Sequence, residues 1–156
     1  MGHSAPTETP SAKSSGRLGD WYANAIPVHR RHVVLAVSGV TLVPVLVEAA
    51  PYKTMTSTFV AATGEVLRAL RVRDTHVAVE LDAMRELVMA PTNDRRVLGS
   101  MNDFARMVQG YIGDEPSLLR VALKLAESPC SPLGMKNPRE ATLALFSTPT
   151  LRLVKS

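Results

Sequence analysis

The chain has 156 residues, of which 46% are hydrophobic and 21% are charged, and its 18 basic residues outnumber its 14 acidic ones to give a formal charge of +4. This length and composition indicate one globular domain, because a chain of this size buries about 70% of its unfolded surface without disulfides or a structural metal. They exclude a disulfide-rich secreted scaffold, a collagen-like fibre and a wholly disordered chain. The only cysteine, Cys130, allows no internal disulfide and favours a reducing, cytoplasmic compartment.

The first 17 residues are rich in Ser, Pro and Thr and show neither a helical nor a strand period. They also lack the continuous apolar stretch of a signal peptide. We therefore predict a disordered tail over 1–17, a single domain over 18–148 and a short C-terminal tail over 149–156.

The apolar stretch 33–50 has two possible interpretations. Its length alone would suit a membrane span. Its many valines favour extended structure, and Ser38 and Gly39 lie near its middle, where a tight turn of a hairpin would be. Pro44 suits a strand at a sheet edge, where its missing N–H costs little. We therefore predict a hairpin, preceded by one more strand, so that three antiparallel strands cover 18–28, 32–38 and 41–48.

After residue 51 the apolar residues recur every three or four positions, which predicts four or five packed helices. They begin near Met55, Asp74, Ser100, Asp114 and Asn137. Ser100 with Asp103, and Asn137 with Glu140, have the spacing of N-terminal helix caps. The residues between the second and third helices are expected to form a short apolar piece and then a polar loop. The predicted fold class is thus α+β: a small antiparallel sheet of about three strands followed by helices.

Motifs for catalysis are weak. Cys130 has no neighbouring base in the sequence that would lower its pKa, and Ser100 lacks the second glycine of a nucleophile elbow. His29 and His32 would point to opposite faces of an extended segment, so they are a poor metal pair. We predict no catalytic residue, no metal site and no cofactor, and the sequence leans against an enzyme.

Two polar clusters are candidates for a ligand site, because amides, acids and the planar forks of arginines can line a pocket. Turns, helix caps and a structural ion pair would explain the same residues. The candidate ligand-binding residues are Asp20, Trp21, Asn24, Arg95, Arg96, Ser100, Asn102 and Asp103. For nucleic acid the candidates are Arg30, Arg31, Arg95 and Arg96.

Four separated blocks of the chain carry a resemblance to a known family. The blocks are LGDWYAN at 18–24, VLGSMNDFARM at 97–107, LAESPCSPLG at 125–134 and PREATLALF at 138–146. With these blocks in order, the chain resembles the bacterial domain-of-unknown-function family 6933 over about residues 18–146. The resemblance implies an intracellular bacterial protein, and it brings no established activity, cofactor or catalytic residue. Relatives usually begin with an additional strand and a short helix, so we expect an uncovered sheet edge beside the first strand.

These observations lead to three functional hypotheses. The leading one is a non-enzymatic binding or adaptor domain that meets another protein, or a second copy of itself, at the open strand edge. The second is a nucleic-acid-binding accessory protein of a mobile element or plasmid, since some relatives look like the leading portion of plasmid-associated proteins. The third is an enzyme whose small polar pocket forms between the first strand and the 93–103 loop. None of them involves a membrane.

Overall fold

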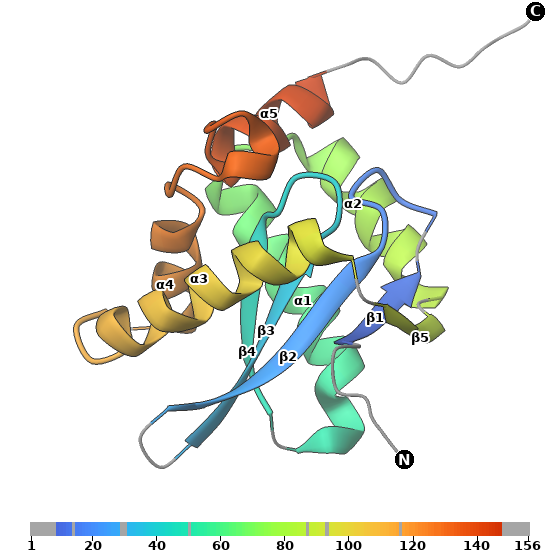
Figure 1. The fold of residues 1–156 in the computed structure, drawn as a ribbon. Coiled ribbons are helices and arrows are strands. Elements are labelled where there is room, and N and C mark those ends of the chain that lie inside the picture. Colours follow the sequence, from blue (N-terminus) through green and yellow to red (C-terminus); the bar gives the residue numbers. More distant parts are fainter. Residues whose placement is uncertain are drawn as a thin grey trace, which may run out of the picture.

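The computed structural model describes residues 9–13, 15–28, 31–49, 51–86, 88–92, 94–115 and 117–147; for 9–13, Tyr52, Glu86 and 88–92 it describes the backbone alone. Within these ranges, five strands form one antiparallel sheet in the order β4-β3-β2-β1-β5, with five α-helices around it (Figure 1). The predicted α+β fold class is confirmed.

The three predicted strands form the larger part of the sheet. They are β2 (Trp21–Val28), β3 (Arg31–Ser38) and β4 (Pro44–Glu48). The turn between β3 and β4 is held by the Ser38 hydroxyl, which accepts from the backbone N–H groups of Val40 and Thr41 at 3.1 Å each and donates to the Leu18 carbonyl. The hairpin interpretation is therefore correct. No helix in the described part of the chain is both long and apolar enough to cross a membrane.

The sheet has two strands that the sequence did not predict. Residues Thr9–Lys13, expected in a disordered tail, form β1, and Val88–Thr92, expected in part as a polar loop, form β5. The two strands pair with each other along all five residues, and β1 also pairs with β2. The tail prediction is thus wrong for 9–13, because backbone pairing with distant segments orders a sequence that has no strand pattern of its own. It is also wrong for 15–17, where Arg17 N donates to the buried carboxylate of Glu80. The rest of that tail up to residue 8, Arg30 and the predicted tail 149–156 lie outside the described residues.

The expected open edge beside the first strand is also wrong, because β1 occupies it. The edge strand on the other side, β4, contacts α4 (Leu118–Leu125). A partner strand thus has no open edge to join beside β2, and the hypothesis of association there loses its structural basis.

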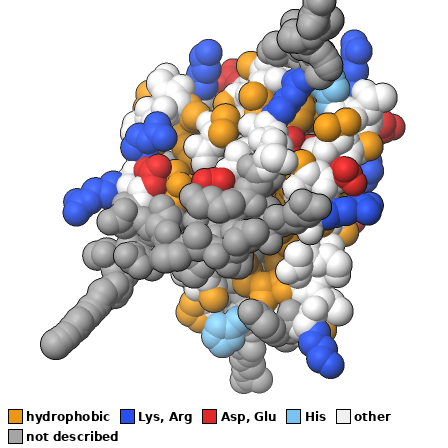
Figure 2. All heavy atoms as spheres, turned by 90° about the vertical axis from the view of Figure 1, so that its right-hand side faces the viewer, with side chains coloured by type: hydrophobic (Ala, Val, Ile, Leu, Met, Phe, Trp, Pro, Cys, Tyr) orange, Lys and Arg blue, Asp and Glu red, His pale blue; other side chains and the backbone are white. Residues whose placement is uncertain are grey.

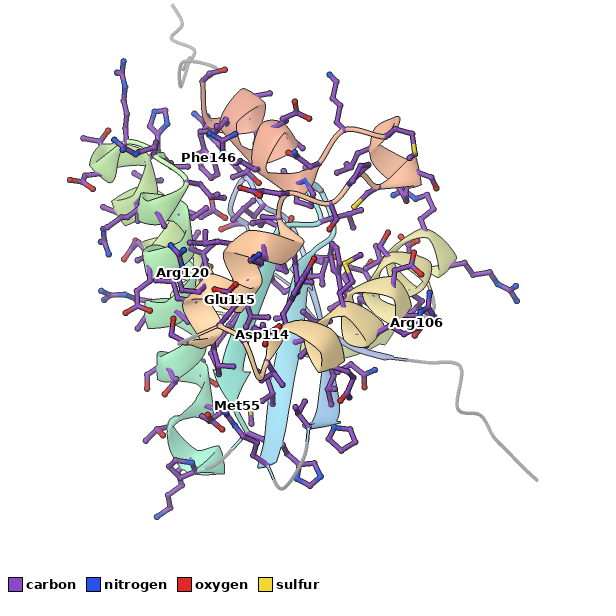
Figure 3. All side chains as sticks on the ribbon, turned by 90° about the vertical axis from the view of Figure 1, so that its left-hand side faces the viewer. Met55, Arg106, Asp114, Glu115, Arg120 and Phe146 are labelled. Atoms are coloured by element: carbon purple, nitrogen blue, oxygen red, sulfur yellow. The ribbon has the colours of Figure 1, made fainter. Side chains whose placement is uncertain are left out.

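The helices cover both faces of the sheet. α1 (Met55–Ala69) and α2 (Asp74–Ala83) lie on one face, and α3 (Arg95–Tyr111) crosses the other (Figures 1 and 3). α5 (Pro138–Ser147) docks at one end of the sheet, where the Thr142 hydroxyl donates to Thr41 Oγ1 at 3.0 Å in the interior. The core contains the side chains that fill both interfaces between the sheet and the helices, among them Trp21, Leu35, Leu67, Phe104 and Leu125.

The helix boundaries agree with the sequence best where a cap lies next to a clear period. α5 begins as predicted, with reciprocal bonds in which Glu140 N donates to Asn137 Oδ1 at 2.7 Å and Asn137 N donates to Glu140 Oε1 at 3.1 Å. α3 was predicted to begin at Ser100, but it begins earlier, at Arg95. The Asp94 side chain caps it by accepting from Arg96 N. Ser100 is 8% exposed and lies inside the helix, because the buried positions run on through it from Val97. α4, in contrast, begins later than predicted, at Leu118 after the Ser117 cap rather than near Asp114.

Candidate binding site

A cleft of about 770 Å³ opens between α3 and the segment that precedes α5. We call it the α3 cleft. Its α3 wall includes five predicted site residues, and the lining further contains groups that the prediction omitted. The predicted residues are Arg95, Arg96, Ser100, Asn102 and Asp103. The omitted ones are Gly99, Phe104, Arg106 and Met107 from α3, and Pro129, Cys130, Ser131, Pro132 and Met135 opposite.

The other predicted candidates do not line this cleft. Trp21 is 1% exposed and packs edge-on against Phe59 of α1, with 5.1 Å between ring centroids. Asn24 is exposed on β2, and Asp20 lies in the turn before β2, where its carbonyl accepts from Gly39 N at 2.8 Å. The first strand and the 93–103 region therefore do not build one polar pocket, because the strand directs Trp21 into the core facing α1 and the cleft lies on the side of α3.

The exposed side of α3 carries a regular stripe. Arg95, Gly99, Asn102 and Arg106 follow one another at four, three and four residues, which places them on one face of a helix. Since a helix rises 1.5 Å per residue, the two arginines at the ends of the stripe are about 16 Å apart along its axis. A β-carbon added at Gly99 would meet no other atom within 4 Å, so the middle of the stripe is open.

The charges of the α3 wall are partly paired. Arg106 Nη2 lies 2.5 Å from Asp103 Oδ1, one turn away, and Arg96 Nε lies 3.8 Å from Asp94 Oδ1. Arg95 is exposed and makes no ion pair within the described ranges. Three arginines and one aspartate line the cleft, so its electrostatic field favours an acidic ligand.

The opposite wall is a tight loop whose backbone is well bonded. Leu133 N and Met135 N both donate to the Cys130 carbonyl, at 3.0 and 2.9 Å. Gly134 and Met135 have φ angles of 67° and 69°, in the left-handed region. A methionine there is strained, and its side chain is nevertheless 62% exposed. The loop thus presents an apolar side chain at the rim of the cleft, at a cost in backbone energy.

Cys130 is buried in this loop. Burial raises the pKa of its thiol, and the negative charge of Asp103 raises the pKa further. The thiol remains protonated at neutral pH and contacts the Ser128 carbonyl at 3.4 Å. This arrangement does not favour a nucleophile.

The candidate arginines for nucleic acid do not form one patch in the described structure. Arg31 pairs with Glu48 across β3 and β4, whereas Arg95 and Arg96 begin α3, away from that end of the hairpin (Figure 1). On the face shown in Figure 2, basic side chains are spread around the surface among acidic and apolar ones. Arg30 lies outside the described residues.

A second groove, of about 370 Å³, lies where the residues before β2 meet α2 and the end of α5. We call it the Glu80 groove; it is lined by Ser15, Gly16, Arg17, His76, Val79, Glu80, Asp82, Ala83 and Phe146. Glu80 is 1% exposed, and its two carboxylate oxygens accept from Arg17 N at 2.8 Å and Leu18 N at 3.1 Å. The Arg17 guanidinium donates to the Leu145 carbonyl and lies over the Phe146 ring, labelled in Figure 3.

Sequence reasoning missed both Glu80 and Arg106, although each had a signal. Glu80 lies between Val77 and Met84 on the inward face of the second helix, where a carboxylate needs a partner. Arg106 lies eleven residues after Arg95, which is close to three helical turns. That spacing is informative only when the helix begins at Arg95 rather than at Ser100. Among the described residues, no group of three or more His, Cys, Asp or Glu side chains could hold a metal ion.

The fold and the cleft define an α+β domain with a partly cationic cleft on its α3 side. The model of the family "Domain of unknown function (DUF6933)" matches residues 2–141. The chain therefore belongs to this family, as the resemblance indicated, and the match includes β1, which lies before the four blocks that carry the resemblance. No match was found among the curated proteins or the solved structures.

Proposed function

We propose that this protein is a non-enzymatic binding domain and that the α3 cleft receives a segment of another protein. The observation that carries the proposal is the composition of the cleft, where exposed arginines and the exposed Met135 face one open space. Arginine and methionine are enriched at protein interfaces, and arginine adds directed hydrogen bonds to the area that it buries.

The chemistry of the lining supports binding rather than catalysis. The pKa of Cys130 is raised, so its thiol is a poor nucleophile, and the Asp103 carboxylate is already engaged by Arg106. The strained, exposed Met135 supports the same proposal, because backbone strain tends to persist where a side chain serves recognition.

A bacterial source and a cytoplasmic location form part of the proposal. The family resemblance supports the first, and the single buried cysteine in a chain without possible internal disulfides supports the second.

Site-specific cross-linking tests the proposed site. A photo-reactive benzophenone side chain replaces Met135 in one sample and Val79, which is 71% exposed on α2, in the control. In cells that naturally make the protein, we expect a defined protein adduct from position 135 and not from position 79. The captured protein, once purified, should bind the wild-type chain in calorimetry and bind the Arg95→Glu/Arg96→Glu variant at least about tenfold more weakly.

The other hypotheses predict different results. An adduct between two copies of this chain would indicate self-association through the cleft. Binding of RNA or DNA that depends on the same arginines and weakens steeply with salt would favour the nucleic-acid hypothesis. The same adducts from positions 135 and 79, or none from 135, would contradict the proposed site.

A further inference from the structure

We infer that the α3 cleft binds an extended acidic peptide segment with two carboxylate side chains four residues apart. This inference rests on the proposed function. Two properties of the described residues support this ligand: the spacing of Arg95 and Arg106 along α3, and the mixture of charged and apolar groups along the cleft.

The spacing of the arginines selects the spacing of the acids. Arg95 and Arg106 are about 16 Å apart along α3, with Asn102 between them. In an extended peptide, side chains four residues apart lie on the same face, about 13 Å from each other. The long arginine side chains can close the remaining difference. The Asn102 amide can both donate to and accept from the peptide backbone that passes over Gly99.

The polar groups of the cleft favour an extended segment over a helix. A helical ligand pairs its backbone N–H and C=O groups internally, so it would offer the Asn102 amide no backbone partner along the middle of its length. An extended chain leaves its backbone N–H and C=O groups free for hydrogen bonds with the walls of the cleft.

The remaining lining favours a peptide over nucleic acid. Single-stranded nucleic acids are usually held by exposed aromatic rings, on which bases stack. The one aromatic side chain in the lining, Phe104, is 1% exposed and belongs to the core. Met107 and Met135 offer apolar surface to a peptide side chain between the two acids.

Asp103 acts in this proposal as an internal competitor. Its carboxylate occupies the Arg106 guanidinium in the free protein, at 2.5 Å. A peptide carboxylate must displace it, so removing the charge of Asp103 should strengthen binding rather than weaken it.

A selection from a random peptide library displayed on phage tests the ligand class with the full chain as bait. We expect enriched peptides to carry Asp or Glu at positions i and i+4. The best of them, made synthetically, should bind at least about tenfold more weakly to Arg95→Ala and to Arg106→Ala, and several-fold more tightly to Asp103→Asn. Moving the two acids next to each other at constant composition should also weaken binding.

The matched control for Arg106→Ala is Arg85→Ala. Arg85 is 76% exposed and pairs with Asp82 at i,i+3, as Arg106, 75% exposed, pairs with Asp103. Arg85→Ala should leave peptide affinity unchanged. Far-ultraviolet circular dichroism should show that all variants fold.

Each other result has a definite meaning. Enriched peptides that need Met135 but carry no acidic pair would overturn this inference and leave the proposed function standing. Equal loss of affinity in Arg85→Ala and Arg106→Ala would show that only general charge matters, and would overturn it too. A selection that yields no binder would overturn the peptide class, while the cross-linking from position 135 decides the proposed function separately.

Discussion

The Glu80 groove and the α3 cleft use charged side chains in opposite ways. In the groove, a carboxylate that is 1% exposed accepts from two backbone amides and fixes the segment that leads into β2. In the cleft, exposed guanidinium groups face an open space, and Arg95 has no ion-pair partner in the described part of the chain. A buried charge that is fully hydrogen-bonded serves the fold, whereas an exposed and incompletely paired one is free to meet a ligand. Four substitutions test this contrast.

The largest effect should come from Glu80→Ala. The change removes two hydrogen bonds to a charged acceptor and leaves the Arg17 and Leu18 amides without it, so we expect a loss of about 3 kcal/mol in the free energy of unfolding. Urea denaturation measures the loss. Asp82→Ala, on the same helix but with a side chain 78% exposed, is the control and should change stability by less than about 0.5 kcal/mol. Equal effects of the two variants would refute a structural role for Glu80.

A smaller loss is expected from Gly16→Ala. A β-carbon there would lie 2.2 Å from Glu80 Oε2, and the carboxylate cannot withdraw without giving up its backbone hydrogen bonds. We expect a loss of about 2 kcal/mol. In a Glu80→Ala background the clash is gone, so the cost of Gly16→Ala should shrink, and a double-mutant cycle in urea measures this coupling. Additive effects would show that the two residues do not interact.

A glycine-to-alanine substitution in the α3 cleft should raise the stability of the protein, whereas Gly16→Ala should lower it. Gly99 lies inside α3 with open space around its Cα, so Gly99→Ala should stabilise the protein by about 0.5–1 kcal/mol through helix propensity. Gly110→Ala, also in α3 with open space and outside the cleft, should have a similar effect on the melting temperature. A bulkier side chain should distinguish the two positions by ligand binding. Gly99→Leu should block binding in the cleft, and Gly110→Leu should not.

The smallest change concerns the thiol at the base of the cleft. The Asp103 charge disfavours the Cys130 thiolate, so Asp103→Asn should lower the pKa of Cys130. Burial, the larger cause, persists in the variant, so the pKa should remain above the usual value. The rate of alkylation by iodoacetamide as a function of pH, measured on the folded protein, should move to lower pH in Asp103→Asn. It should not move in Asp82→Asn, and an unchanged profile in Asp103→Asn would remove Asp103 as a cause.

The sequence predicted those elements whose signals are local. The β3–β4 hairpin has its turn residues and its valines in one short stretch, and α5 has its cap next to its helical period. The start of α3 lies before the predicted one, because Asp94 and Ser100 are both residue types that cap helices and the capping pattern alone does not exclude the earlier start. The buried position of Val97 in the same period favours the earlier start.

The strands β1 and β5 could not be predicted in this way. β1 contains no large apolar residue and β5 contains Pro91, so neither segment has a clear strand signal of its own. Each becomes a strand through pairing with the other and, for β1, with β2. The candidate site was half predicted for a related reason. The residues of α3 are neighbours in sequence, whereas the opposite wall comes from the segment after α4, and only tertiary structure brings the two together.

The weak attachment of β1 to the sheet determines which part of the domain should unfold first. β1 joins β2 through two residue pairs, whereas β2 and β3 share eight, and its partners in β5 are about eighty positions away in the chain. Such a contact is costly in loop-closure entropy and tends to form late in folding. We expect the pair β1 and β5 to separate from strands β2, β3 and β4 as one cooperative unit. The amide hydrogens of β1 and β5 should then exchange faster than those of β3. Because β5 leads directly toward the first turn of α3, such local unfolding would reach the cleft before it reached the rest of the molecule.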